Sequence, residues 1–125
     1  MIQPLAGIRV CSLAINLPGP LAAARLVALG ATMVKIEPPG GDPLAAASPA
    51  WYAELHSRID VRTLDLKAPA AREQLYAVLA AADLLITASR PAALARLGLA
   101  WPALQARYPA LSQVAIVGHA GSQAD

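Results

Sequence analysis

The chain has 125 residues and a net charge of +2, and 57% of its residues are hydrophobic while only 4% are aromatic. This length holds one domain, which we place over residues 1–125. The small charge, with no basic run and no basic residues interleaved with aromatic ones, argues against nucleic-acid binding. Because the apolar stretches are all interrupted well short of the roughly 20 residues that cross a bilayer, no membrane span is predicted.

A single cysteine, Cys11, excludes an intramolecular disulfide and fits a reducing compartment, so we expect a cytoplasmic protein. Cys11 lies inside an apolar run, where cysteine behaves as a small buried hydrophobic residue. We therefore predict a buried thiol and not a catalytic one.

Short apolar runs alternate with helical stretches along the chain. The runs predict buried strands at Ile8–Ile15, Thr32–Ile36, Val61–Leu66, Leu84–Thr87 and Leu111–Val117. Prolines at first helical turns and apolar periodicity predict helices at Pro20–Leu29, Trp51–His56, Pro69–Ala82, Pro91–Gly98 and Trp101–Arg107. Gly30 is predicted as a left-handed helix cap, and Pro38–Pro49 as a loop. Strands that alternate with helices predict right-handed crossovers, and hence a Rossmann-like α/β fold with a parallel sheet.

Ligands of such sheets bind just beyond the carboxyl ends of the strands. The segments that follow the predicted strands are Asn16–Gly19, Glu37–Pro43, Asp65–Lys67, Ser89–Arg90 and Gly118–Gly121. Lys67, Arg90 and Arg96 lie near this edge together with several helix N-termini, which favour a phosphate-bearing anion. The alternative is that Lys67 and Arg90 cap carbonyls or pair with Asp65 and Asp83.

Other kinds of site have weaker support. Gly19 stands alone without the GxGxxG pattern of a dinucleotide site, although Glu37 has the spacing of an acid that holds a ribose hydroxyl. His56 and His119 are far apart in sequence, so no metal-ligand spacing is present and no metal is expected. Ser12 and Ser57 have no neighbouring histidine and aspartate that would make them nucleophiles.

Two blocks carry a resemblance to a known family. They read LPGPLAAARLVALGATMVKIEPPGGDP at residues 17–43, and LDLKAPAAREQL followed by RPAALARLGL within residues 64–99. In this order they resemble the N-terminal part of the family III coenzyme A transferases, which include formyl-CoA transferase, carnitine-CoA transferase and alpha-methylacyl-CoA racemase. The resemblance implies an acyl-CoA ligand whose nucleotide lies over the carboxyl edge of the sheet.

Matching the family's motifs residue by residue implies a set of CoA-binding positions: Leu17, Pro18, Leu64, Asp65, Leu66, Lys67, Ala88, Ser89, Arg90 and Arg96. The three cations of this set can neutralise phosphates, whereas Leu64 and Ala88 can only form walls. The chain departs from the family at four places: Pro38 replaces an arginine, His56–Val61 loses basic character, Ala92 replaces a glycine, and Val117–Gly121 replaces a glycine-rich segment.

The resemblance places the transferase aspartate, or the racemase His/Asp pair, beyond Asp125. It therefore implies no catalytic residue within the chain, an N-terminal portion that is inactive alone, and self-association, since family members are interlocked dimers. Two alternatives stay open. One is a degenerate module that pairs with a longer homologue, and the other is an unrelated nucleotide-binding α/β domain.

Overall fold

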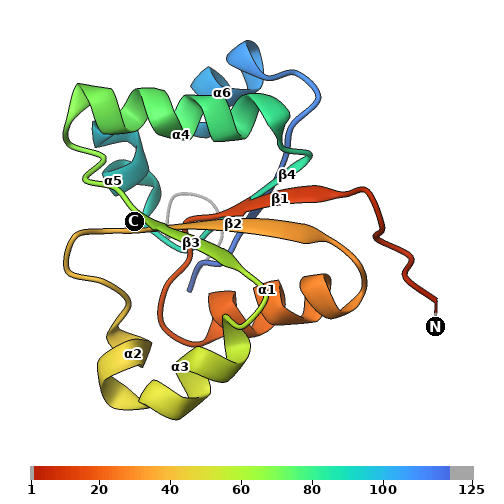
Figure 1. Ribbon diagram of the computed structural model, residues 1–125. Helices are drawn as coiled ribbons and strands as arrows, with labels where there is room; N and C mark the ends of the chain where they lie inside the picture. Colours follow the sequence, from red (N-terminus) through yellow and green to blue (C-terminus); the bar gives the residue numbers. More distant parts are fainter. Residues whose placement is uncertain (1, 119–125) are drawn as a thin grey trace.

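Five strands pair in parallel to form one sheet within residues 2–118, the part of the chain that the computed structural model describes (Figure 1). They are β1 (Arg9–Ser12), β2 (Thr32–Glu37), β3 (Asp60–Thr63), β4 (Leu84–Thr87) and β5 (Ser112–Ala115). The order β3-β2-β1-β4-β5 places β1 at the centre, and the chain crosses over between β3 and β4. This is the order of a Rossmann-like half, so the predicted α/β class is confirmed.

Helices cover both faces of this sheet (Figure 1). α1 (Pro18–Ala28), α2 (Pro43–Ala47) and α3 (Pro49–Leu55) lie on one face, and α4 (Pro69–Ala81), α5 (Pro91–Arg96) and α6 (Trp101–Arg107) lie on the other. No helix within residues 2–118 combines the length and the apolar character needed to cross a bilayer.

α1 ends where the sequence predicts. Gly30 has φ 111°, its N–H donates to the Val27 carbonyl, and the Ala31 N–H donates to the Leu26 carbonyl. These two bonds form a Schellman motif, in which a left-handed glycine closes the last turn of a helix. The predicted capping role of Gly30 is confirmed.

Several predicted boundaries are wrong: β1 ends at Ser12 and not at Ile15, α1 begins at Pro18 and not at Pro20, and α3 begins at Pro49 and not at Trp51. The predicted loop at Pro38–Pro49 contains α2, whose first turn is capped by the Asp42 carboxylate, an acceptor for the Leu44 N–H at 2.9 Å. The third strand also ends at Thr63 and not at Leu66. Within residues 2–118 it pairs with β2 alone, and β2 ends at Glu37. After the Leu64 N–H bonds to the Glu37 carbonyl, this part of the chain offers β3 no further strand to pair with.

The core has two layers, one on each face of the sheet. Alternation along β1 sends Cys11 toward the α4 face and Val10 toward the α1 face. The α4 layer is built on leucines of α4, β4 and the α5–α6 region, and the smaller α1 layer contains Ala14, Ala23, Met33 and Ile86. Small alanine side chains let α1 pack close to the sheet at the cost of buried apolar area.

Candidate functional site

A cavity of about 530 Å³ opens at the carboxyl ends of β1 to β4, the edge to which the sequence assigns the ligand. Its walls are mostly apolar, with a few polar groups at the rim. They are formed by Leu13, Ile15, Asn16, Ile36, Glu37, Pro38, Pro39, Leu64, Asp65, Leu66, Lys67, Ala88, Ser89, Leu94, Leu97 and Leu99. This combination of apolar walls and few polar groups is typical of small-molecule sites.

The structure brings together most of the positions implied by the family resemblance. The turn after β3 and the end of β4 supply Leu64, Asp65, Leu66, Lys67, Ala88 and Ser89. Four other positions lie outside the lining. Leu17 and Pro18 begin α1 beside Asn16, Arg90 precedes the first turn of α5, and Arg96 lies in its last turn.

Lys67 is the cation that lines the cavity, and its side chain is exposed to solvent. The neighbouring Asp65 accepts a hydrogen bond from the Lys67 backbone N–H at 3.1 Å. Asp83, the other suggested partner, instead bonds Arg9, whose backbone N–H lies 2.9 Å from the Asp83 Oδ2. Within residues 2–118, then, neither Lys67 nor Arg90 forms the ion pairs that the alternative interpretation required.

Asn16 is a lining residue that the motif comparison missed. Its φ of 70° makes it the non-glycine residue with positive φ among residues 2–118, in a conformation that asparagine tolerates better than most residues. Its backbone N–H donates to Asp42 Oδ1 at 2.9 Å. The loop after β1 is therefore tied to the loop after β2, which contributes Pro38 and Pro39 to the cavity.

A buried ion cluster, made of Lys35, Glu37, Asp42, Tyr52 and His56, lies beneath this loop. Lys35 is almost fully buried although it carries an ammonium group. Its Nζ lies 2.5 Å from Asp42 Oδ2, 3.1 Å from Glu37 Oε2 and 2.7 Å from His56 Nε2. The three donors of the ammonium thus meet three acceptors, which is the condition for burying a charge.

The same bonds assign the histidine proton. His56 Nδ1 lies 2.7 Å from the Tyr52 carbonyl, which can only accept, so Nδ1 donates and Nε2 accepts from Lys35. The His56 ring also stacks on Tyr52, with ring centroids 3.9 Å apart. The ring is therefore held as a structural part of the cluster.

Glu37, Asp42 and His56 offer potential metal ligands that the sequence reasoning did not group. Their ligand atoms lie within 4.8 Å of one another, but the Lys35 ammonium stands between them. A cation is already supplied by the chain at this position, so the group is not suited to a metal. The signal in the sequence was a lysine and a glutamate on the same face of an apolar strand; His119, the histidine considered with His56, lies outside the described residues.

Burial and hydrogen bonds set two pKa values in the cluster. Burial alone would raise the pKa of Asp42, but hydrogen bonds from Lys35, Leu44 and Asn16 outweigh it and hold that pKa below its ordinary value. Burial, followed by the bond from its hydroxyl to Glu37 at 2.5 Å, raises the pKa of Tyr52. Asp42 is thus ionised and Tyr52 neutral near pH 7.

Glu37 is the residue whose spacing in the sequence suggested a dinucleotide ligand. A ribose-binding acid needs a carboxylate free to accept from the sugar hydroxyls. Here Glu37 is buried, and its Oε2 already accepts from Tyr52 and Lys35. Glu37 is thus engaged in the buried ion cluster through Oε2.

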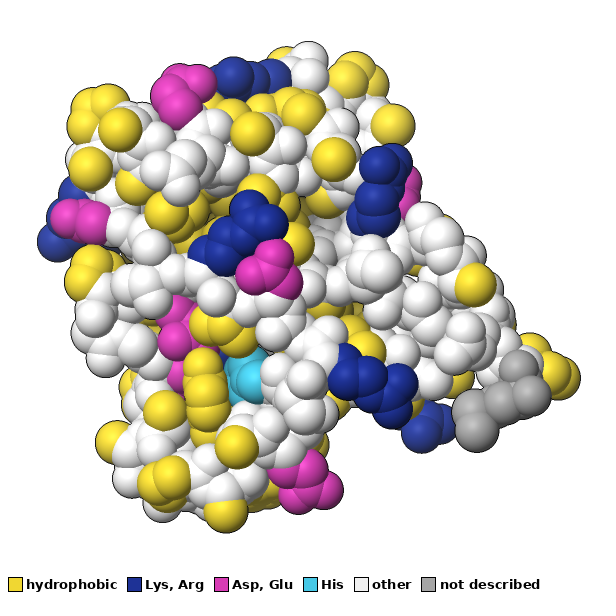
Figure 2. Space-filling view, in the orientation of Figure 1, with side chains coloured by type: hydrophobic (Ala, Val, Ile, Leu, Met, Phe, Trp, Pro, Cys, Tyr) yellow, Lys and Arg dark blue, Asp and Glu magenta, His cyan; other side chains and the backbone are white. Residues whose placement is uncertain are grey.

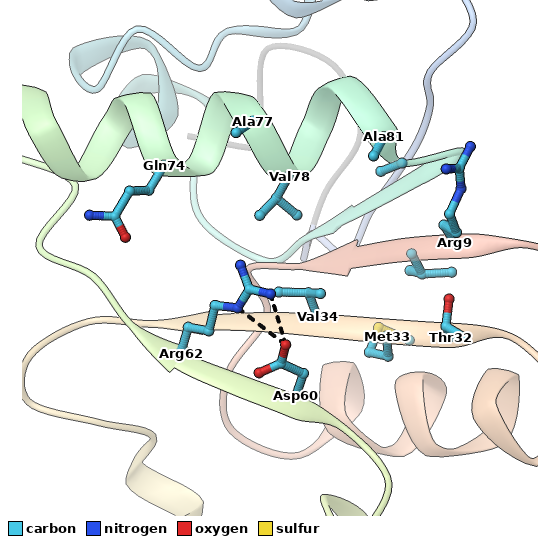
Figure 3. Close-up of a pocket in the computed structure, with 12 residues that line it drawn as sticks. Arg9, Thr32, Met33, Val34, Asp60, Arg62, Gln74, Ala77, Val78 and Ala81 are labelled. Carbon is cyan, nitrogen blue, oxygen red and sulfur yellow. Dashed lines mark hydrogen bonds and ion pairs between the residues drawn. The ribbon is translucent and has the colours of Figure 1, made fainter.

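A second cavity of about 590 Å³ lies between α4 and the faces of β1, β2 and β3 (Figure 3). Figure 2 shows apolar side chains gathered beneath α4, above a basic and an acidic group. Arg62 at its rim bonds Asp60 at 2.9 Å, so this cation is already neutralised. Because it also lies away from the strand ends, we do not assign the anion site to this cavity.

The fold defines a Rossmann-like domain, and its first cavity lies at the carboxyl edge, where ligands of such sheets bind. The family model of CoA-transferase family III matches residues 5–125. The chain belongs to this family, as its sequence motifs indicate.

Comparison with individual proteins supports the same family. The chain is 37% identical to the alpha subunit of succinyl-CoA–L-malate CoA-transferase from Chloroflexus aurantiacus, over 93% of this chain and 29% of the relative. It is 31% identical to the probable fatty acyl-CoA transferase Rv3272 from Mycobacterium tuberculosis, over 96% of this chain and 33% of that protein.

Solved structures show the same fold. A crystal structure of Rv3272 matches with a TM-score of 0.89 and 31% identity, covering 98% of this chain and 36% of the other. A CAIB/BAIF family protein from Brucella suis matches with a TM-score of 0.86 and 30% identity, covering 99% and 36%. The chain thus spans about a third of the length of these relatives.

Proposed function

We propose that the cavity at the carboxyl edge binds the nucleotide end of a CoA thioester, as part of an acyl-CoA-handling enzyme of the transferase or racemase type. The observation that carries the proposal is the convergence of residues 64–67, Ala88 and Ser89, implied by the family motifs, on one cavity. The relatives named for CoA transfer support the ligand class.

The adenine ring and the phosphates of the ligand have partners in this arrangement. The apolar walls, including Leu64 and Ala88, accept the adenine ring, and Lys67 at the rim neutralises a phosphate. Arg90 follows the lining residue Ser89 and is exposed, so its side chain is available to a phosphate outside the cavity. Arg96 is assigned to the ligand by the resemblance, and a charged contact of this kind contributes about 1.5–3 kcal/mol.

The proposal assigns binding, and not group transfer, to the described residues. Of the acidic side chains that line the cavity, Glu37 is held by Lys35 and Tyr52, and Asp65 accepts from the backbone of its own turn. We expect no transfer when the pure chain is incubated with succinyl-CoA and L-malate, the substrates in the name of one relative. Transfer by the pure chain would refute this assignment.

Thermal unfolding with CoA tests the binding proposal, with NAD as the comparison ligand. A ligand present at 100 times its Kd stabilises the folded state by about 2.7 kcal/mol. We expect Tm to rise with CoA concentration and not with NAD. A rise with NAD alone would contradict the proposal that this cavity binds CoA.

We also propose that the chain self-associates, with a second copy covering the apolar cavity under α4. Its lining includes Val34, Ala77 and Val78, and an apolar area of this kind that is left partly exposed on a small domain favours association. The alternative of a module that pairs with a longer homologue relies on the same surface.

Ala77→Lys places a charge in this cavity, whereas Ala80→Lys places one on an exposed part of the same helix. We expect light scattering to show a smaller mass for Ala77→Lys alone; a monomer for the unmodified chain at high concentration would contradict self-association.

A further inference from the structure

Asp42 joins three parts of the chain without lining the cavity. Its Oδ1 accepts from the backbone N–H groups of Asn16 and Leu44, each at 2.9 Å, and its Oδ2 accepts from Lys35 Nζ at 2.5 Å. The side chain is completely buried. One carboxylate thus links the loop after β1, the start of α2 and the buried ion cluster.

The bond to Asn16 reaches across 26 residues, and it acts on a strained point of the backbone. Asn16 lines the cavity with φ at 70°, a region that costs free energy for any residue with a side chain. Such a conformation persists where neighbouring groups hold it, and here the group that holds the Asn16 N–H is Asp42.

We infer that Asp42 is a positioning residue of the ligand site. It holds Asn16 in the left-handed conformation, and it thereby fixes the wall of the cavity where the loops after β1 and β2 meet. This inference rests on the proposed CoA-binding function and assigns a task to a residue that does not contact the ligand.

The buried ion cluster orients the Asp42 carboxylate. Lys35 fixes Oδ2, and Lys35 is itself fixed by Glu37 and His56, so that Oδ1 is directed to the two backbone N–H groups. A buried ion pair adds little net stability compared with packed apolar side chains. Its contribution here is a fixed geometry at the cavity wall.

A purely structural role is the competing explanation, because Asp42 also caps α2. Asp42→Ser separates the two roles. Serine is a good helix cap, so it keeps the bond to the Leu44 N–H two residues away. Its hydroxyl oxygen lies one bond closer to the backbone than Oδ1 and Oδ2, so it falls short of the Asn16 N–H and of Lys35 Nζ. Leu111→Ala serves as the control, since Leu111 is a core residue outside the cavity lining whose truncation lowers stability.

The experiment measures amide hydrogen exchange at Asn16 and the Kd for CoA in the full chain, at a temperature where each variant is folded. We expect Asp42→Ser to lose protection at Asn16 and to bind CoA about tenfold more weakly, the effect of ordering one backbone residue on binding. Leu111→Ala keeps both values. Wild-type protection and affinity in Asp42→Ser would overturn the inference.

The experiment also distinguishes two further outcomes. If the unmodified chain does not bind CoA, the proposed function fails, and the exchange at Asn16 still decides whether Asp42 holds this loop. If Asp42→Ser does not fold, Asp42→Glu replaces it, since the longer side chain keeps the charge near Lys35 but displaces the oxygen from the two N–H groups. Retained Asn16 protection in Asp42→Glu, with unchanged Kd, would then overturn the inference.

Discussion

Gly19 and Ala14 are in such close contact that a Cβ atom at Gly19 would lie 2.2 Å from the Cβ of Ala14. Both residues are buried, and the contact holds the start of α1 against the segment that follows β1. Gly19, which stands alone without the GxGxxG pattern of a dinucleotide site, therefore has a packing role, because its missing side chain lets the helix approach the sheet.

Gly19→Ala should therefore destabilise the protein by about 1–3 kcal/mol, the usual cost of overpacking a core contact. Gly40→Ala is the matched control, because a Cβ at Gly40 has no neighbour within 4 Å among the described atoms. Urea unfolding of the two variants measures the difference. Equal midpoints for Gly19→Ala and Gly40→Ala would show that α1 shifts without cost.

Lys35→Met should be much more damaging than Arg62→Met. Lys35 lies between two buried carboxylates, and removing it leaves them without a counter-charge, a loss of about 3–5 kcal/mol. The Arg62–Asp60 pair is about half exposed, where an ion pair contributes about 0–1 kcal/mol. Chemical denaturation separates these cases, and similar losses in both variants would argue against a buried cluster.

Acid should remove the stability that Asp42 contributes. The pKa of Asp42 is held below its ordinary value of 3.8 in the folded protein, so the unfolded state binds the proton first as the pH falls. The contribution is complete above about pH 4 and is lost as the pH falls further, through the folded pKa. Asp42→Asn should flatten the acid limb of a stability–pH curve, whereas Asp60→Asn at an exposed pair is the control; an unchanged limb in Asp42→Asn would contradict the assignment.

Cys11 should be unreactive in the folded protein. It is fully buried, and burial raises its pKa from 9.0 to about 12, against a small opposing effect of Arg62. Because the thiolate is the reactive form, a disulfide reagent at pH 8 should modify Cys11 only as fast as the protein opens. Rapid labelling under native conditions would show that the central strand is accessible.

The sequence predicted the order and type of the main elements because its signals were local. Apolar runs placed the strands, prolines marked the starts of α4 and α5, and Gly30 closed α1 as expected. The end of β3 could not be predicted from its own residues, because it depends on where its partner β2 ends. The short α2 was missed since its start is set by Asp42, whose role becomes visible only in three dimensions.

The residues of the candidate site also fall into a part that local sequence patterns predict and a part that they do not. Motifs that follow strands, such as Leu64–Lys67, reach the cavity because strand ends meet at one edge of the sheet. The buried ion cluster joins residues from β2, the following loop and α3, whose approach no local pattern encodes. A lysine in a buried strand was the available hint, since a buried charge requires partners elsewhere in the chain.

The central claim is that the cavity at the carboxyl edge binds CoA, and calorimetric titration of the chain with CoA tests it most directly. We predict heat of binding for the unmodified chain, with affinity about tenfold lower in Lys67→Ala, the loss of one charged contact. Arg25→Ala, which removes a cation from the last turn of α1, should bind like the unmodified chain. Equal weakening in both variants, or no heat with the unmodified chain, would contradict the claim.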